Sequence, residues 1–168
     1  QAITATAAST YTYDMLTGDR LNTAAGTYTV PPSAIIGNAT YFGEDLGLGR
    51  GRGTPSVEVF TGSGTPAVAT SLAVALQGAP DNGGGAVSGL TFVPYISTRA
   101  IPLASILASS RIAQFDLPRR TDNQGLPRFI NLAYTVVGTN FTGLTLKSYI
   151  NLGGTSAQGT LGQYPSNY

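Results

Sequence analysis

Eight carboxylates are the side chains of this sequence best suited to acid–base chemistry, because the chain has no histidine and no cysteine. Without those two residue types, a Ser–His triad, a cysteine nucleophile and a zinc site built on nitrogen and sulfur ligands are excluded. A glycosidase needs two carboxylates that face each other across a cleft, but Glu44 and Asp45 are adjacent, and adjacent strand side chains point to opposite faces. The full set is Asp14, Asp19, Glu44, Asp45, Glu58, Asp81, Asp116 and Asp122. No pair stands out, so we predict no enzymatic activity, no metal and no cofactor.

The glycine-rich stretch 47–53 carries Arg50 and Arg52 and invites comparison with a phosphate-binding loop. It lacks the Gly-Lys-Ser/Thr ending of such a loop, and its glycines do not follow the dinucleotide-binding spacing. Thr54-Pro55 then leads into a strand and not into a helix. Two interpretations stay open: a flexible turn that enters the strand, or a pair of arginines that bind carboxylates of a neighbouring subunit.

A second basic cluster consists of Arg119, Arg120 and Arg128. Three charges are few for nucleic acid, because that affinity grows with the number of phosphates neutralised. The cluster could contact an acidic protein surface or form local pairs with Asp116 or Asp122.

The chain as a whole carries little charge. Charged residues make up 10% of its 168 residues, and the net charge is +1, against about 25% charged residues in a typical domain. No long-range field therefore attracts nucleic acid or a membrane surface, and no apolar stretch is long enough to span a membrane. A surface of Thr, Ser, Asn, Gln and Gly suits a crowded, repetitive assembly, and it suits a secreted or cell-surface β-domain equally well.

Short apolar runs of period two must position whatever chemistry the chain has. Twenty-two Gly and ten Pro argue against long helices, and clusters of turn residues separate the runs. The strands that we predict are 2–8, 56–60, 71–77, 90–97, 111–117, 128–137 and 144–152, with a short one at 27–30 or 101–103. Pro94 places the strand 90–97 at a sheet edge or at a bulge, and Leu103–Ser110 could form one or two helical turns.

About eight antiparallel strands predict an all-β fold, a β-sandwich of the jelly-roll type. Residues 1–152 form this single domain, and two segments interrupt its rhythm. The first is a long insertion, 10–42, and the second is an extended tail, 153–168. Both mix tyrosine with small polar residues, a composition suited to docking on a partner. An ordinary solvated loop and a frayed terminus are the alternatives.

Several stretches of the chain, taken in order, match the pattern of one known family. They are the opening 1–10, Asp45-Leu46-Gly47 before the strand 55–60, the segments 99–103 and 115–119, and Arg128–Tyr134. They resemble, in turn, the N-terminal strand, the turn before the next strand, the middle section and the Arg-aromatic-aliphatic-x-Leu-x-Tyr strand of the jelly-roll capsid cement (decoration) proteins of short-tailed bacteriophages, of the Bordetella-phage cement type. Together these pieces cover about two thirds of the chain. The segment Tyr11–Glu44 and the tail after Gly153 depart from the family pattern.

The resemblance implies a virion structural protein on the outer capsid surface, where it binds the major capsid protein and stabilises the shell. It also implies a homodimer or homotrimer, with no nucleic acid and no membrane as partner. A partner that binds only the mature shell stabilises that shell by mass action. We predict the capsid or subunit contacts at the tyrosines and arginines of the added segments and the glycine-rich turn: Tyr11, Tyr13, Tyr28, Tyr41, Arg50, Arg52, Tyr164 and Tyr168. The alternative is a carbohydrate-binding β-sandwich with a groove and two or more exposed tyrosines.

Overall fold

The two longest strands, β6 (Ser71–Ala79) and β11 (Phe129–Val137), form the centre of the larger sheet. The structure is a computed structural model that describes residues 1–14, 20–23, 27–28, 56–80, 85–116 and 127–151. In it the two strands pair antiparallel along their full lengths, so that Leu76 lies opposite Leu132. Because side chains alternate along a strand, Leu72, Val74 and Leu76 of β6 share one face of this sheet with Ile130, Leu132 and Val136 of β11.

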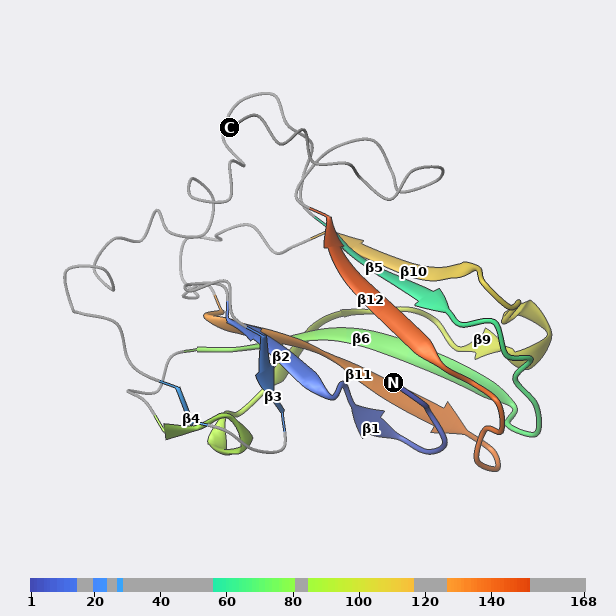
Figure 1. The fold of residues 1–168 in the computed structure, drawn as a ribbon, viewed down its shortest axis with the longest axis horizontal. Helices are drawn as coiled ribbons and strands as arrows, with labels where there is room; N and C mark the ends of the chain where they lie inside the picture. Colours follow the sequence, from blue (N-terminus) through green and yellow to red (C-terminus); the bar gives the residue numbers. More distant parts are fainter. Residues whose placement is uncertain (15–19, 24–26, 29–55, 81–84, 117–126, 152–168) are drawn as a thin grey trace, which may run out of the picture.

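Shorter strands extend the larger sheet on both sides of this pair (Figure 1). On one side lie β2 (Tyr11–Asp14) and β3 (Arg20–Asn22), and on the other side lies β8 (Val93–Ser97), in the order β3-β2-β11-β6-β8. Two two-residue strands complete it: β1 (Ala7–Ala8) pairs with β11, and β9 (Ile101–Pro102) pairs with β6.

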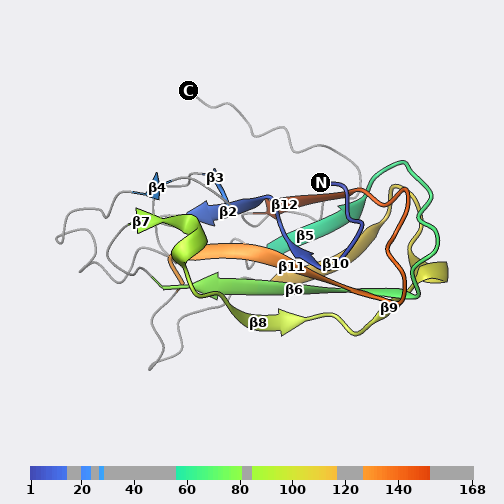
Figure 2. The same ribbon diagram turned by 90° about the horizontal axis from the view of Figure 1, so that it is seen from below.

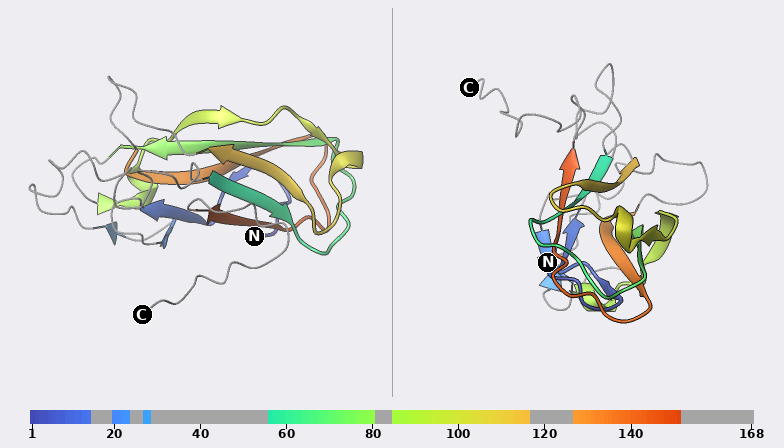
Figure 3. Two further views of the ribbon diagram at one scale, coloured as in Figure 1. Left: turned by 90° about the horizontal axis from the view of Figure 1, so that it is seen from above. Right: turned by 90° about the vertical axis from the view of Figure 1, so that its right-hand side faces the viewer.

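A smaller sheet has the order β10-β5-β12 and covers one face of the larger one (Figures 2 and 3). Its strands are β5 (Ser56–Thr61), β10 (Arg111–Asp116) and β12 (Leu146–Asn151), and both pairings are antiparallel. A separate pair joins β4 (Thr27–Tyr28) to β7 (Gly85–Ala86). Two single 3-10 turns are described, η1 (Val87–Gly89) and η2 (Leu103–Ser105).

The main core fills the space between the two sheets. It includes Val57 and Val59 from β5, Phe115 from β10, and the apolar faces of β6 and β11. A second, smaller cluster lies on the opposite face of the larger sheet, where Phe129 packs with Ala79, Val87 and Leu90. The larger sheet is therefore buried on both faces near the start of β11.

The structure confirms the all-β antiparallel sandwich, and the jelly-roll connectivity stays a prediction. The predicted strands within 56–60, 71–77, 90–97, 111–117, 128–137 and 144–152 are present with small shifts of their ends. β8, which contains Pro94, is the last strand of its sheet, and the register shifts between Leu76 and Gln77 where it pairs with β6. A proline inside a strand requires this arrangement, because it lacks the backbone donor of an inner strand.

Three predictions were too coarse. The strand predicted at 2–8 is reduced to β1 and one bridge at Ala2, because the segment bonds to Leu144 through Ile3 and then crosses to pair with β11. Leu103–Ser110 forms one 3-10 turn only. The segment 10–42 is not wholly an insertion, because β2 and β3 within it belong to the larger sheet.

No helix in the described ranges is long and apolar enough to cross a membrane.

Candidate functional site

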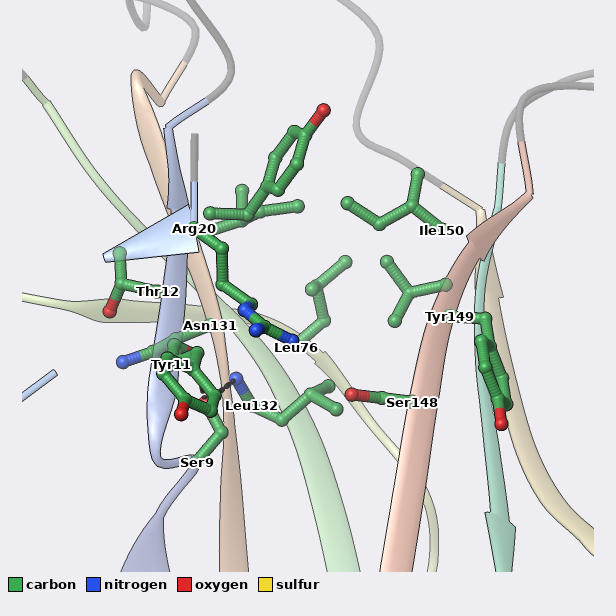
Figure 4. A pocket seen from close by; sticks show the side chains of 13 residues that line it. Ser9, Tyr11, Thr12, Arg20, Leu76, Asn131, Leu132, Ser148, Tyr149 and Ile150 are labelled. Carbon is green, nitrogen blue, oxygen red and sulfur yellow. Dashed lines mark hydrogen bonds between the residues drawn. The ribbon is translucent and has the colours of Figure 1, made fainter. Parts of the chain in front are cut away.

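A groove opens between β2 of the larger sheet and β12 of the smaller one (Figure 4). β12 is an edge strand of the smaller sheet, whereas the larger sheet continues beyond β11 to β2 and β3. The groove lies between β12 and this extension of the larger sheet. The cavity has a volume of about 370 Å³, which lies within the range of small-molecule sites, roughly 300–1,000 Å³. We call it the β2–β12 groove.

The floor of the β2–β12 groove is aliphatic. It consists of Val57, Leu76, Ile130 and Leu132, all of them core residues with at most 4% of their surface exposed. The β2 wall is aromatic: Tyr11 and Tyr13 are two residues apart and so share one face of the strand. Tyr13 packs against the core, and Tyr11 keeps 46% of its surface exposed.

The opposite wall is β12. Figure 4 shows Ser148 and Ile150 directed into the groove and Tyr149 directed away from it. The Tyr149 ring instead packs edge-on against Phe60, with ring centroids 5.9 Å apart. Thr12 and Asn131 also point away, to the far side of β2 (Figure 4). Apart from Arg20, the side chains that face the space therefore present the two tyrosines, the Ser148 hydroxyl and aliphatic carbon.

Arg20 is the only charged residue among those that line the groove within the described part of the chain. It extends from β3 across Tyr11 toward the space between the walls (Figure 4), with its guanidinium carbon 4.3 Å from the centre of the Tyr11 ring. This cation–π contact leaves the donors of the guanidinium available. The two ion pairs found in the described residues do not involve Arg20.

The N-terminal residues connect the two sheets through backbone hydrogen bonds. Gln1 and Leu146 exchange two backbone hydrogen bonds, of 2.9 and 2.8 Å, and the Ile3 amide donates to the Leu144 carbonyl at 2.9 Å. The chain then crosses to the other sheet, where the Ser9 amide donates to the Leu132 carbonyl at 2.7 Å. The segment thus ties the start of β12 to β11 and leaves the stretch of β12 around Ser148 facing the groove.

A buried ion pair fixes the β2 wall from behind. Asp14 accepts hydrogen bonds from Arg128 Nε at 3.1 and 3.2 Å and from Nη2 at 2.8 Å, and the two side chains are 3% and 6% exposed. The Arg128 guanidinium carbon also lies 4.9 Å from the centre of the Phe129 ring. The sequence offered Asp116 or Asp122 as local partners of the cluster of Arg119, Arg120 and Arg128; of these, Arg119, Arg120 and Asp122 lie outside the described residues, and the described ion pair of Arg128 is with Asp14. Asp14 is its partner because β2 pairs with the start of β11.

A second buried carboxylate among the described residues is also paired with an arginine. Glu58 is 1% exposed and accepts a hydrogen bond of 3.0 Å from Arg111 Nη1. It lies on β5, on the face opposite to Val57 and Val59, as the alternation predicts. Among the described residues, no group of three or more acidic side chains gathers where it could hold a metal ion.

The predicted contact residues fall into three groups. Tyr11 and Tyr13 come together on β2 at the groove, in a strand and not in the predicted loop. Tyr28 lies in β4, where only its backbone pairing with Gly85 is described. The others lie outside the described residues: Tyr41, Arg50, Arg52, Tyr164 and Tyr168.

Sequence reasoning missed Arg20 and the β12 wall. Nothing in the sequence marks Arg20, because its strand is three residues long and the contact that places it depends on pairing with β2. The alternation of β12 was visible, but its position at a sheet edge was not.

No protein-family model matches the chain, and no curated protein sequence matches it at a significant level.

Proposed function

We propose that this protein is a non-enzymatic virion component, a capsid decoration protein that binds the outside of the shell as a homo-oligomer and stabilises it. The observation that carries the proposal is the surface of β8. All five of its residues are exposed, and three are large and apolar: Val93 at 54%, Tyr95 at 40% and Ile96 at 50%. An apolar strand at the edge of a sheet is a ready template for pairing with another chain.

The position of β8 supports a subunit contact. In the described sheet, β8 is the terminal strand beside β6, and no described strand pairs with its outer side. Tyr95 packs its ring over Gly78, where a Cβ atom would overlap it, and burial raises the pKa of its hydroxyl above the usual 10. The strand is thus anchored on one side while Val93 and Ile96 remain free to contact a neighbour.

Among the described residues, two buried carboxylates have arginine partners. Asp14 and Glu58 each pair with an arginine, so their charges are compensated within the fold. The proposed mechanism is thermodynamic: preferential binding to the assembled shell lowers its free energy, and many copies multiply the effect.

Co-sedimentation with empty capsids of the virus whose genome encodes the chain tests the proposal. We expect saturable, near-stoichiometric binding and a higher capsid melting temperature. Absence of binding at micromolar protein would refute the decoration role.

A matched pair of variants tests the part played by β8. Ile96→Lys places a charge on the edge strand, and edge lysines oppose strand pairing. Leu107→Lys makes the same change at another exposed apolar residue, which is 63% exposed outside any strand. We expect analytical ultracentrifugation to show a smaller oligomer for Ile96→Lys only. Equal behaviour of the two variants would remove β8 from the interface.

Carbohydrate binding is the second candidate, and the groove is the observation that favours it. Tyr11 is half exposed beside the cavity, and aromatic side chains can stack on sugar rings. The arrangement is less favourable than predicted, because Tyr149 points away and Arg20 covers one part of the Tyr11 ring. A glycan array separates the candidates, since only this one requires glycan binding in the absence of capsids.

A further inference from the structure

We propose that the β2–β12 groove binds a small amphipathic anion, such as an alkyl or aryl carboxylate, with the apolar body on the aliphatic floor and the anionic group on Arg20. This site does not depend on the decoration role, because it lies on the side of the sandwich away from β8 and needs no second subunit.

The floor determines the apolar part of the ligand. Its four residues belong to the main core, yet they also line a cavity of about 370 Å³ that opens between the sheets. Transfer of an apolar group onto such a surface is favourable by roughly 25 cal/mol per Å² removed from water. A neutral sugar presents hydroxyl groups to most sides, and this floor offers them no hydrogen-bond partner. An alkyl chain or an aromatic ring loses nothing by this contact.

Charge determines the other part of the ligand. Among the described residues that line the groove there is no aspartate or glutamate, and Arg20 is the charged side chain of this set. Its guanidinium is positioned by the Tyr11 ring at 4.3 Å, and a planar guanidinium can bind a carboxylate through two parallel hydrogen bonds. Across the groove, the Ser148 hydroxyl points inward (Figure 4) and can donate a further hydrogen bond. Donors at the rim and aliphatic carbon at the floor together define an amphipathic anion.

Octanoate and 1-octanol are the probes that test the proposal, because they share a chain length and differ in charge. Titration of each into ¹³C-methyl-labelled protein, followed by NMR, measures affinity and location together. We expect octanoate to shift the methyl signals of the aliphatic floor and of Ile150 in a saturable way, and to bind about tenfold more tightly than 1-octanol. Shifts confined to β8 or scattered over the surface would overturn the site.

Two variants test the roles of the wall residues. Arg20→Gln should weaken octanoate about tenfold and leave 1-octanol unchanged, because one charge-assisted contact is lost. Ser148→Phe should abolish the binding of both probes, because the new ring would occupy the groove. Arg99→Gln is the matched control, since Arg99 is exposed and does not line the groove; it should bind both probes as the parent does.

Folding is checked first by circular dichroism and by the midpoint of urea unfolding. If Arg20→Gln binds octanoate like the parent, the anionic part of the proposal is wrong. If a neutral oligosaccharide produces the same methyl shifts with higher affinity than octanoate, the groove is a sugar site and the proposal fails. Should either variant misfold, competition on the parent protein decides the point: octane sulfonate should displace octanoate and octylammonium should not, and equal displacement by both would overturn the proposal.

Discussion

The buried pair of Asp14 and Arg128 gives the strongest prediction about stability. Asp14→Asn keeps the shape of the side chain and removes its charge. Both Arg128 donors that reach Asp14, at 2.8 to 3.2 Å, then face a neutral amide. The Arg128 side chain remains buried, with 6% of its surface exposed. Removal of one partner of a buried ion pair costs about 3–5 kcal/mol, because the remaining charge loses the opposite charge that faced it in the interior.

The assay is urea unfolding followed by circular dichroism, with the free energy of unfolding taken by linear extrapolation. A loss of about 3–5 kcal/mol is a large part of the roughly 5–15 kcal/mol that holds a domain folded. Asp116→Asn is the control, because Asp116 is an exposed carboxylate at the end of β10, and surface changes of this kind usually stay within about 0.5 kcal/mol.

A double variant separates the charge from the packing. Asp14→Leu with Arg128→Met replaces the pair by apolar side chains, and we expect it to be more stable than Asp14→Asn alone. A double-mutant cycle then yields a coupling energy between the two positions. The reasoning is refuted if Asp14→Asn costs less than about 1 kcal/mol, or if the double variant loses the full sum of the single losses.

Three further changes have expected outcomes that unfolding experiments can check. Burial raises the pKa of Tyr134 to about 12 from 10, so the stability it supports is present below pH 10 and declines above it, by about 1.4 kcal/mol per pH unit. Tyr134→Phe should therefore lose less stability than the parent between pH 10 and 12; parallel pH curves would contradict this. Gly143 has φ of +73°, and a Cβ atom added there would lie 2.6 Å from the Thr65 carbonyl oxygen. Gly143→Ala should therefore lower the free energy of unfolding by about 2 kcal/mol. Gly89 has open space around it, so Gly89→Ala should cost less than half of that. Val68 is 60% exposed and has φ of +82° at the centre of a γ-turn, in which the Ala69 amide donates to the Ala67 carbonyl at 3.1 Å. Val68→Gly should therefore raise the free energy of unfolding by about 1 kcal/mol. A lower melting temperature of this variant would show that the turn is not strained.

Alternation of side chains made the long strands predictable. β6, β10 and β11 each present apolar residues at every second position, and period two suffices to identify a strand and its buried face. The edge position of β8 was predictable from Pro94 alone, because a missing donor is a local property with a consequence for the whole sheet.

The groove was not predictable, because it arises from relations between distant segments. Tyr11 and Tyr13 were identified as contact residues, but their place opposite Ser148 depends on how far each sheet extends. The partner of Arg128 was missed for the same reason: Asp14 lies 114 residues away in the sequence. Local patterns show which residues carry a charge but not which distant segment each of them will face.

The hydrogen bonds between Gln1 and Leu146 have a consequence for how the chain folds. They join residues 145 positions apart. β5 likewise can pair with β12 only after residues 146–151 have been synthesised. On the ribosome, the smaller sheet therefore cannot be completed until nearly all of the described chain has emerged. Contacts of such long range slow the folding of β proteins, because loop closure comes before the stabilising contacts. We expect the apolar faces of β6 and β11 to remain uncovered during synthesis, so that yield at high expression temperature is limited by aggregation of the nascent chain more than by the stability of the finished sandwich.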